Sequence, residues 1–393
     1  MEAYLDNSAT TRCYEEVKDI VVKTMMDDYG NPSAMHQKGV ESERYVKEAA
    51  GQIAATLKVQ EKEIYFTSGG TESNNWALIG TALANRRQGN HIIISSIEHP
   101  AVSVPAEFLE SQGFEVTRLG VNAQGQISPE ELKEAIRPET ILVSVMFVNN
   151  EIGAVEPIAE IGELIKQVNP KTYFHVDAIQ AYGKFRILPK KMHIDMLSAS
   201  GHKLNGPKGI GFLYIRKGIK IRSFVHGGQQ ERGRRAGTEN IPGIVGLAAA
   251  AKRSFSMLEE KMKKEIELRD YLISRIEAEI PYCRLNGDRK KRLPNNVNFS
   301  FQFIEGESML ILLDSKGIAA SSGSACTSGS LDPSHVLLAI GLPHEIAHGS
   351  LRLTMSEENT KEEMDYVVEQ LTAILERLRS MSPLYEDFMK KQK

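Results

Sequence analysis

The chain has 393 residues, of which 41% are hydrophobic and 25% charged, and its formal net charge is −3. This length is too great for one small core and predicts two domains, while the small net charge gives no electrostatic reason to expect nucleic-acid binding. The longest apolar stretch, residues 244–251, is too short to cross a bilayer, and no basic segment followed by an apolar one marks a secretory signal.

Seven short β-rich runs alternate with helical stretches between about residues 60 and 215. The runs lie at residues 63–67, 91–95, 114–118, 141–145, 173–176, 196–199 and 211–215. Amphipathic stretches such as 128–136 and 158–168 separate them, and Ser128 before a proline and two glutamates is typical of a helix N-cap. This alternation predicts an α/β domain with a mostly parallel sheet flanked by helices, in which ligands bind at the carboxyl ends of the strands.

The pattern changes after about residue 245. A long charged helix is expected over residues 252–280, then a strand at 296–303, a helix near 307–316, a Gly/Ser-rich loop and a final helix at 360–379. We assign these elements to a smaller α+β domain. The predicted division is therefore a large domain at residues 15–250 and a small domain at residues 1–14 and 251–393.

The chain has only three cysteines, Cys13, Cys283 and Cys326, and a small odd number does not suit a disulfide framework. Such sparse use fits a reducing compartment, so we expect a cytoplasmic protein. No pair has the spacing of metal ligands, and no metal site is expected.

The loop at residues 198–209 is rich in glycine and contains Lys203. A lysine that forms a Schiff base with an aldehyde needs such surroundings, because small neighbours leave room for the ligand, although Lys208 is a rival in the same loop. Asp177 follows a buried-looking run and is either a helix cap or a carboxylate that pairs with the ring nitrogen of pyridoxal phosphate (PLP). Gln180 would then donate to the phenolic oxygen of the ring.

A phosphate cradle is predicted at residues 64–74, where a strand, a glycine turn and the start of a helix follow one another. Backbone N–H groups and the helix dipole favour an anion beside Gly70, and the Thr71 hydroxyl adds a donor. Ser200 and His202 from the lysine loop would complete the cradle. A Gly-Gly pair alone is equally compatible with an ordinary turn.

With these motifs the chain resembles the cysteine desulfurases of the NifS/IscS type, in the class V aminotransferase group, whose members have the PLP fold-type I. The resemblance runs from the sequence LDNSATT at residues 5–11 nearly to the C-terminus. Further matches lie at residues 29–33, 98–99, 148–153 and 235–240. The resemblance implies a large domain with a seven-stranded, mostly parallel sheet.

The resemblance also implies a role for each matching residue. Lys203 would bind the PLP aldehyde, Asp177 would pair with the pyridinium and His99 would stack on the ring. The ring oxygen region would be contacted by Asn150 and Gln180, and the phosphate by Gly70, Thr71, Ser200 and His202. Thr238 would contact the phosphate of the neighbouring subunit in a homodimer. Arg352 would bind the substrate carboxylate, with Asn150 also in the substrate site. Taken alone, a histidine before a proline such as His99 is more often a turn or core residue than a catalyst, and an arginine such as Arg352 more often forms a surface salt bridge, although an arginine fork suits a carboxylate.

Cys326 lies in a run of small residues, 319–330, that has no large apolar anchor. Such a run is better suited to moving than to packing; a merely structural thiol is the alternative, and it is our interpretation of Cys283. Cys13 is given no role. The resemblance is to group I desulfurases, which have the sequence SSGSACT in an extended loop.

We therefore expect a PLP-dependent cysteine desulfurase that converts L-cysteine to L-alanine. Lys203 would remove the Cα proton, His99 would shuttle a proton at the substrate thiol, and Cys326 would take the sulfur as a persulfide. The sulfur would then pass from Cys326 to an acceptor protein for iron–sulfur cluster assembly, thio-cofactor synthesis or tRNA thiolation. The alternatives are a class V aminotransferase, which needs no loop thiol, a selenocysteine lyase, and a non-catalytic partner of acceptor proteins.

Overall fold

The structure, a computed structural model, describes residues 1–322 and 333–392. In that part of the chain, no helix has both the length and the apolar character needed to cross a membrane.

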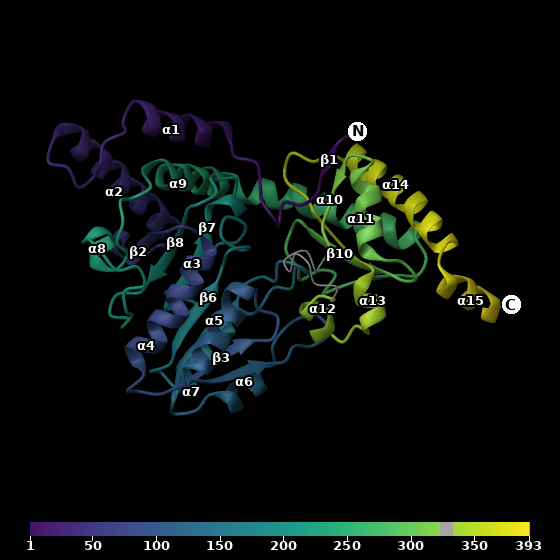
Figure 1. The fold of residues 1–393 in the computed structure, drawn as a ribbon, viewed down its shortest axis with the longest axis horizontal. Coiled ribbons are helices and arrows are strands. Elements are labelled where there is room, and N and C mark those ends of the chain that lie inside the picture. The colour runs from purple at the N-terminus through teal and green to yellow at the C-terminus, as the bar shows by residue number, and fades with distance from the viewer. Residues whose placement is uncertain (323–332, 393) are drawn as a thin grey trace.

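A seven-stranded sheet forms the centre of the larger part of the molecule (Figure 1), in the order β2–β8–β7–β6–β5–β3–β4. Its strands are β2 (Ile64–Thr67), β3 (His91–Ser95), β4 (Glu115–Leu119), β5 (Thr140–Met146), β6 (Tyr173–Asp177), β7 (Met196–Ser200) and β8 (Gly211–Ile215). Within this sheet β8 is antiparallel to both of its neighbours, and all other pairs are parallel. The predicted mostly parallel α/β sheet is confirmed.

Helices cover both faces of this sheet, so that β5 is buried along its whole length. One face packs against α1 (Glu15–Met26), α2 (Gln37–Leu57), α6 (Pro129–Ala135), α7 (Ile158–Val168) and α9 (Ile241–Ser256). The other face packs against α5 (Pro100–Ser111) and a continuous helical stretch made of α3 (Gly70–Asn75), η2 (Trp76–Gly80) and α4 (Thr81–Asn85).

A second core lies around a three-stranded antiparallel sheet with the order β12–β10–β9. The sheet contains β9 (Cys283–Leu285), β10 (Asn296–Phe301) and β12 (Ser350–Thr354), and it packs with α10 (Leu258–Glu279), α11 (Gly306–Asp314) and α14 (Lys361–Ser380). The N-terminal β1 (Ala3–Tyr4) joins this core by pairing with β11 (Ile318–Ala319). The helices α12 (His335–Ala339) and α13 (His344–His348) pack in a separate apolar cluster with Met146 and Ile152, and α15 (Pro383–Gln392) follows α14. The predicted domain boundaries at residues 14 and 250 stay a prediction.

The prediction of a single long helix over residues 252–280 is wrong. Two helices occupy this stretch, because Met257 has φ −109° and ψ 11°, outside the α-helical range, and separates α9 from α10. The first of them begins much earlier, at Ile241, where the side chain of Asn240 accepts a hydrogen bond from Gly243 N and caps the helix.

Candidate active site

A cavity of about 450 Å³ lies at the carboxyl ends of β5, β6 and β7. It brings together most of the residues predicted from the sequence: Gly70, Thr71, His99, Asn150, Asp177, Gln180, Ser200, His202, Lys203 and Arg352 all line it. Thr238 does not line this cavity and is exposed. Cys326 lies outside the described residues.

Lys203 ends a short 3₁₀ turn, η3 (Gly201–Lys203), directly after β7. Its Nζ donates hydrogen bonds to the main-chain oxygens of Ser8 at 2.5 Å and Ala9 at 2.8 Å. Two carbonyl acceptors stabilise the charged form of an amine and fix its position. The rival Lys208 is exposed and does not line the cavity. The geometry therefore favours Lys203.

Asp177 is the last residue of β6 and is buried. Its Oδ1 accepts a hydrogen bond from Ile179 N at 3.0 Å, and its Oδ2 accepts one from Asn74 Nδ2 at 2.7 Å. The first bond is the cap-like turn that the sequence allowed, but the second holds the carboxylate in the floor of the cavity. Burial raises the pKa of this carboxyl, while its hydrogen bonds and the nearby His99 and Lys203 act in the opposite direction.

His99 caps the N-terminus of α5, and its Nδ1 accepts a hydrogen bond from Ala101 N at 3.0 Å. An acceptor at Nδ1 places the proton of the neutral ring on Nε2. Burial lowers the pKa of His99; the negative charge of Asp177 acts in the opposite direction, and the positive charge of Lys203 lowers the pKa further. The residue is thus both the turn residue that the sequence allowed and a neutral imidazole in the cavity wall.

Small residues shape the turn between β2 and α3, where the phosphate cradle is predicted. A Cβ added to Gly70 would lie 2.2 Å from Ile179 Cδ1, and one added to Gly211 would lie 2.4 Å from Ala199 O and 2.8 Å from Gly69 Cα. These close approaches place the helix start beside the end of β7 and its Ser200. Backbone N–H groups at that start, with the hydroxyls of Thr71 and Ser200, suit an anion.

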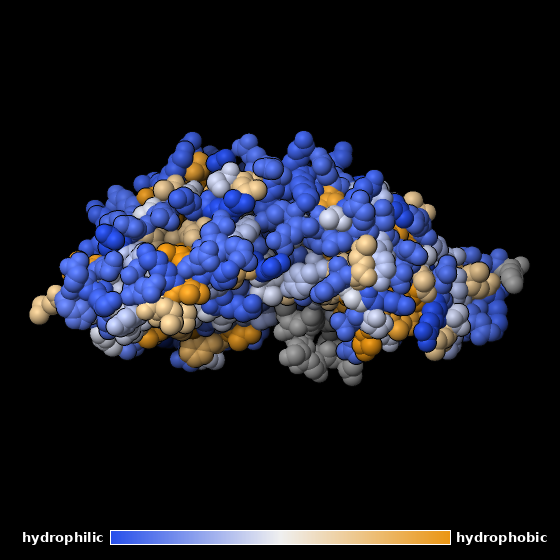
Figure 2. Space-filling view, turned by 90° about the horizontal axis from the view of Figure 1, so that it is seen from above, coloured by the Kyte–Doolittle hydropathy of each residue, from blue (hydrophilic) through white to orange (hydrophobic). Residues whose placement is uncertain are grey.

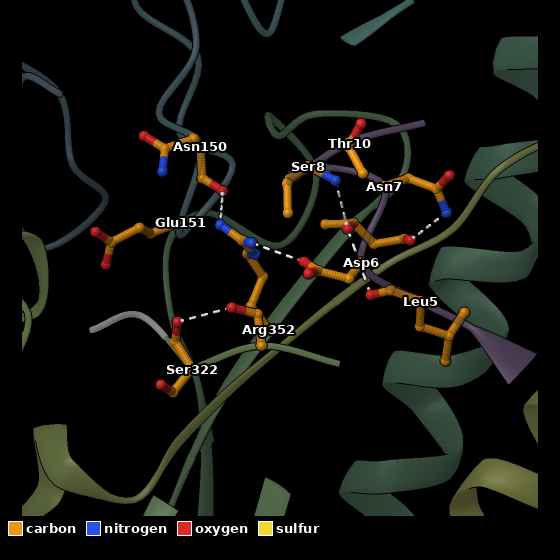
Figure 3. Close-up of polar contacts among 12 residues, drawn as sticks. Leu5, Asp6, Asn7, Ser8, Thr10, Asn150, Glu151, Ser322 and Arg352 are labelled. Carbon is orange, nitrogen blue, oxygen red and sulfur yellow. Dashed lines mark hydrogen bonds and ion pairs between the residues drawn. The ribbon is translucent and has the colours of Figure 1, made fainter. Parts of the chain in front are cut away.

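Arg352 lies on β12 and is 3% exposed. Its Nη1 donates to Asn150 O at 3.1 Å and its Nη2 donates to Asp6 Oδ1 at 2.8 Å (Figure 3). The interpretation of Arg352 as a surface salt bridge is wrong, because its guanidinium is buried and its partner Asp6 is only partly exposed. A buried guanidinium in the wall of a cavity is a good receptor for a ligand carboxylate.

The N-terminal segment forms a wall of this site, which the sequence analysis did not foresee. Asp6, Ser8 and Ala9 line the cavity, and Gln180 Nε2 donates to Ser8 O at 3.0 Å. Asn74, whose amide holds Asp177, was missed as well. Asp6 and Ser8 belong to the LDNSATT motif, so the motif was visible, but its contacts were not.

The described residues on the two sides of the segment that contains Cys326 bond to residues of the cavity wall or to their sequence neighbours. On one side, Arg352 N donates to Ser321 O at 2.7 Å and Ser321 N donates to Arg352 O at 3.2 Å. On the other side, the Ser334 hydroxyl donates to the buried carboxylate of Glu151, and His335 Nε2 donates to Glu98 O at 3.0 Å. One flank therefore contacts Arg352 itself, and the other contacts the residues next to Asn150 and His99.

The lining fits pyridoxal phosphate by its chemistry. A primary amine, a buried carboxylate and a cradle of anion donors are the groups that would meet the aldehyde, the ring nitrogen and the phosphate of this cofactor. Among the described residues, Gln180 Oε1 and Arg352 Nε are buried without a hydrogen-bond partner, so the cavity retains unused polar groups for a ligand.

The comparisons of this chain with a family model and with known proteins give consistent results. The family model described as aminotransferase class-V matches residues 3–367. A protein of Methanosarcina thermophila named cysteine desulfurase IscS is 54% identical over 381 residues, covering 97% of this chain and 94% of the relative. A cysteine desulfurase IscS of Clostridium botulinum is 53% identical over 391 residues, covering 99% and 98%.

Solved structures agree with these relatives. A structure titled NifS-like protein superposes with a TM-score of 0.91 at 37% identity, covering 96% of this chain and 100% of its own. A NifS-like protein from Rickettsia africae superposes with a TM-score of 0.86 at 29% identity, with the same coverage of 96% and 100%.

Proposed function

This chain belongs to the class-V aminotransferase family, among its IscS-type cysteine desulfurases, and from this premise we propose that its cavity converts L-cysteine to L-alanine and that Cys326 takes the sulfur. The observation that carries the proposal is the meeting of Lys203, Asp177 and Arg352 in one cavity. They supply an amine, a carboxylate for a ring nitrogen, and a receptor for an amino-acid carboxylate.

Residues from several elements would hold PLP. Lys203 would bind at its aldehyde, Asp177 at its ring nitrogen, Asn150 and Gln180 near its ring oxygen, and Gly70, Thr71, Ser200 and His202 at its phosphate. When bound, PLP supplies the electron sink that lets the bonds at the substrate Cα break. His202 suits the phosphate as a neutral donor, because burial lowers its pKa to about 4.

The residues of the chain perform the proton transfers. Arg352 binds the carboxylate of L-cysteine and thereby orients its Cα toward Lys203. Lys203 accepts the Cα proton at Nζ, while the hydrogen bonds from Asn74 and Ile179 favour the charged form of Asp177 against the burial that raises its pKa. His99 carries its proton on Nε2 and moves a proton at the substrate thiol.

Cys326 accepts the sulfur. Its thiolate attacks the sulfur atom of bound L-cysteine, a sulfur–sulfur bond forms, and the carbon–sulfur bond of the substrate breaks, leaving a persulfide on Cys326 and the carbon skeleton of alanine. The small residues around it in the sequence support this role. The persulfide sulfur then passes to an acceptor protein of iron–sulfur cluster assembly, thio-cofactor synthesis or tRNA thiolation.

A homodimer completes the site in this proposal. Thr238 is exposed and lies outside the cavity of its own chain, as expected for a residue that reaches the phosphate of a neighbouring subunit. The segment from α1 to α2 exposes Met25, Met26, Tyr29 and Met35, the last of them fully. Figure 2 shows apolar side chains on the part of the surface at the left, where Figure 1 places these helices. A partner subunit would bury them.

The test is the release of sulfide and alanine from L-cysteine in the presence of a reductant. Wild type and the control Cys13→Ser should release equal amounts of both products, and Cys326→Ser should release neither while it still binds PLP. Alanine without sulfide, or activity that does not respond to Cys326→Ser, would instead support the aminotransferase alternative. A preference for selenocysteine over cysteine would support a selenocysteine lyase.

A further inference from the structure

The N-terminal segment contributes a carboxylate that the proposed reaction does not use. Asp6 lines the cavity, and its Oδ1 accepts a hydrogen bond of 2.8 Å from Arg352 Nη2. The side chains are 22% and 4% exposed, respectively, so this ion pair is largely shielded from solvent. Figure 3 shows the guanidinium of Arg352 between Asp6 and Asn150.

Main-chain contacts fix the position of Asp6 beside β12. Asp6 forms a parallel bridge with Thr354, two residues after Arg352 on the same strand. Asn7 Nδ2 donates to Thr354 O at 2.9 Å, Ser8 N donates to Thr354 Oγ1 at 2.9 Å, and Thr354 N donates to Leu5 O at 2.7 Å. The Asp6 carboxylate is therefore held in register with the guanidinium by the residues on both sides of it.

Arg352 needs such a partner because a buried charge without a counter-ion is strongly unfavourable. Its Nη1 donates to the neutral oxygen of Asn150, which gives direction but no compensating charge. The two bonds use two of the five N–H donors of a guanidinium and fix its plane. The remaining donors, including the unpartnered Nε, stay available for a ligand.

We propose that Asp6 is a positioning residue for substrate recognition, which together with Asn150 O holds the guanidinium of Arg352 in place before the carboxylate of L-cysteine binds. Because the guanidinium of Arg352 is already fixed before the ligand binds, less conformational entropy is lost on binding. The inference rests on the proposed function, because it takes L-cysteine as the ligand and Arg352 as its receptor.

The opposite role for Asp6 would be competition, since it could occupy Arg352 at the expense of the substrate. The two roles differ in sign. Removing a positioning residue raises the KM for L-cysteine, whereas removing a competitor lowers it.

The experiment compares steady-state kinetics of Asp6→Ala, Asp6→Asn and Glu259→Gln in the PLP-loaded enzyme. We expect Asp6→Ala to raise KM about tenfold with a much smaller change in kcat, and Asp6→Asn to raise it less, because an amide oxygen still accepts from Nη2. Glu259 forms an exposed ion pair with Arg186 at 3.1 Å, so Glu259→Gln controls for the loss of a carboxylate from an arginine pair and should leave KM unchanged.

Two further measurements separate positioning from a general structural effect. Asp6→Ala should add little to the KM of Arg352→Gln, because the two residues act as a unit. Binding of L-alanine, followed through the absorbance of bound PLP, should weaken in Asp6→Ala, whereas binding of cysteamine, which has no carboxylate, should not change.

An unchanged or lower KM in both Asp6 variants would overturn the inference, and so would independent, multiplying effects of Asp6→Ala and Arg352→Gln. If Arg352→Gln raises KM and the Asp6 variants do not, only the inference fails and the proposed function stands. If Arg352→Gln leaves KM unchanged, the carboxylate site of the proposed function fails together with the inference.

Discussion

The side-chain amide of Asn74 donates a hydrogen bond of 2.7 Å to Oδ2 of Asp177, and both residues are buried. The bond joins α3, which follows the phosphate cradle, to the acid at the end of β6. Because it favours the charged form of Asp177 in a place where burial disfavours that form, Asn74 helps to keep the carboxylate ionised.

Replacing Asn74 should weaken PLP binding. In Asn74→Ala the pKa of Asp177 rises, and a neutral acid pairs less well with the ring nitrogen. A buried hydrogen bond to a charged group contributes about 1.5–3 kcal/mol, so affinity should fall at least about tenfold in a titration of the cofactor-free protein with PLP. Asn75→Ala is the control, since the Asn75 amide donates to Thr71 O in an exposed position. Equal PLP affinity in Asn74→Ala and wild type would contradict this role.

Gly70→Ala should deform the phosphate cradle. The new Cβ would lie 2.2 Å from Ile179 Cδ1, so Ile179, two residues after Asp177, has to move. We expect PLP to be lost during gel filtration, with a smaller loss of thermal stability, because strain of this kind costs about 1–3 kcal/mol. Gly120→Ala, where nothing lies within 4 Å of the added atom, should retain PLP as wild type does. Full retention by Gly70→Ala would show that the cradle tolerates a side chain.

Ser334→Ala should slow the formation of the persulfide. The Ser334 hydroxyl caps α12 and donates to Glu151, so its loss leaves a buried carboxyl oxygen without its donor beside Asn150. Burial raises the pKa of Glu151 to about 7. We expect fewer persulfide-bearing molecules at early times in single-turnover mass spectrometry with L-cysteine. Equal persulfide formation in this variant and wild type would show that the Glu151 contact has no part in sulfur transfer.

Ser128→Ala is the matched control for this experiment. Ser128 caps α6 by accepting from Glu131 N at 3.2 Å, and it does not line the cavity. Loss of a serine cap costs about 1 kcal/mol, so both variants should unfold at a somewhat lower temperature. Only Ser334→Ala should change the rate of persulfide formation.

Glu156→Gln should change how stability depends on pH. Glu156 is buried, its carboxylate accepts from Ile127 N at 3.2 and 3.3 Å, and burial raises its pKa from 4.5 to about 8. A carboxyl whose pKa is higher in the folded state favours folding fully below pH 4.5, and this contribution is lost as the pH rises to about 8. Wild type should therefore lose stability relative to Glu156→Gln between pH 5 and about 8.5, by an amount on the order of a few kcal/mol.

Urea unfolding at both pH values checks this prediction. Glu160→Gln, which removes an exposed carboxyl in the first turn of α7, should follow wild type at each pH. A constant stability difference between wild type and Glu156→Gln across this range would show that Glu156 does not bind a proton on folding.

The sequence by itself determined the class of fold and indicated most of the predicted residues that line the cavity. The strands β3 and β8 were predicted to the residue, because apolar runs bounded by turn residues specify short buried strands. Lys203 and Asp177 were recognisable because each follows such a run, and the ends of parallel strands meet at one edge of the sheet. The role of Cys326 stays a prediction from its run of small neighbours in the sequence, since the residue lies outside the described residues.

Only the tertiary structure decided which side chains hold these groups in place. Asp6 and Arg352 are 346 positions apart in the chain, and Asn74 and Asp177 are 103 positions apart. Local patterns report the periodicity of one helix or strand, and they contain no information on a partner from a distant element. The end of α9 at Met257 was not predicted for a related reason, because no proline or glycine marks it in the sequence. Contacts of this kind arise only when the sheets and helices pack, and here they fix the charge and the direction of the groups that the sequence had already named.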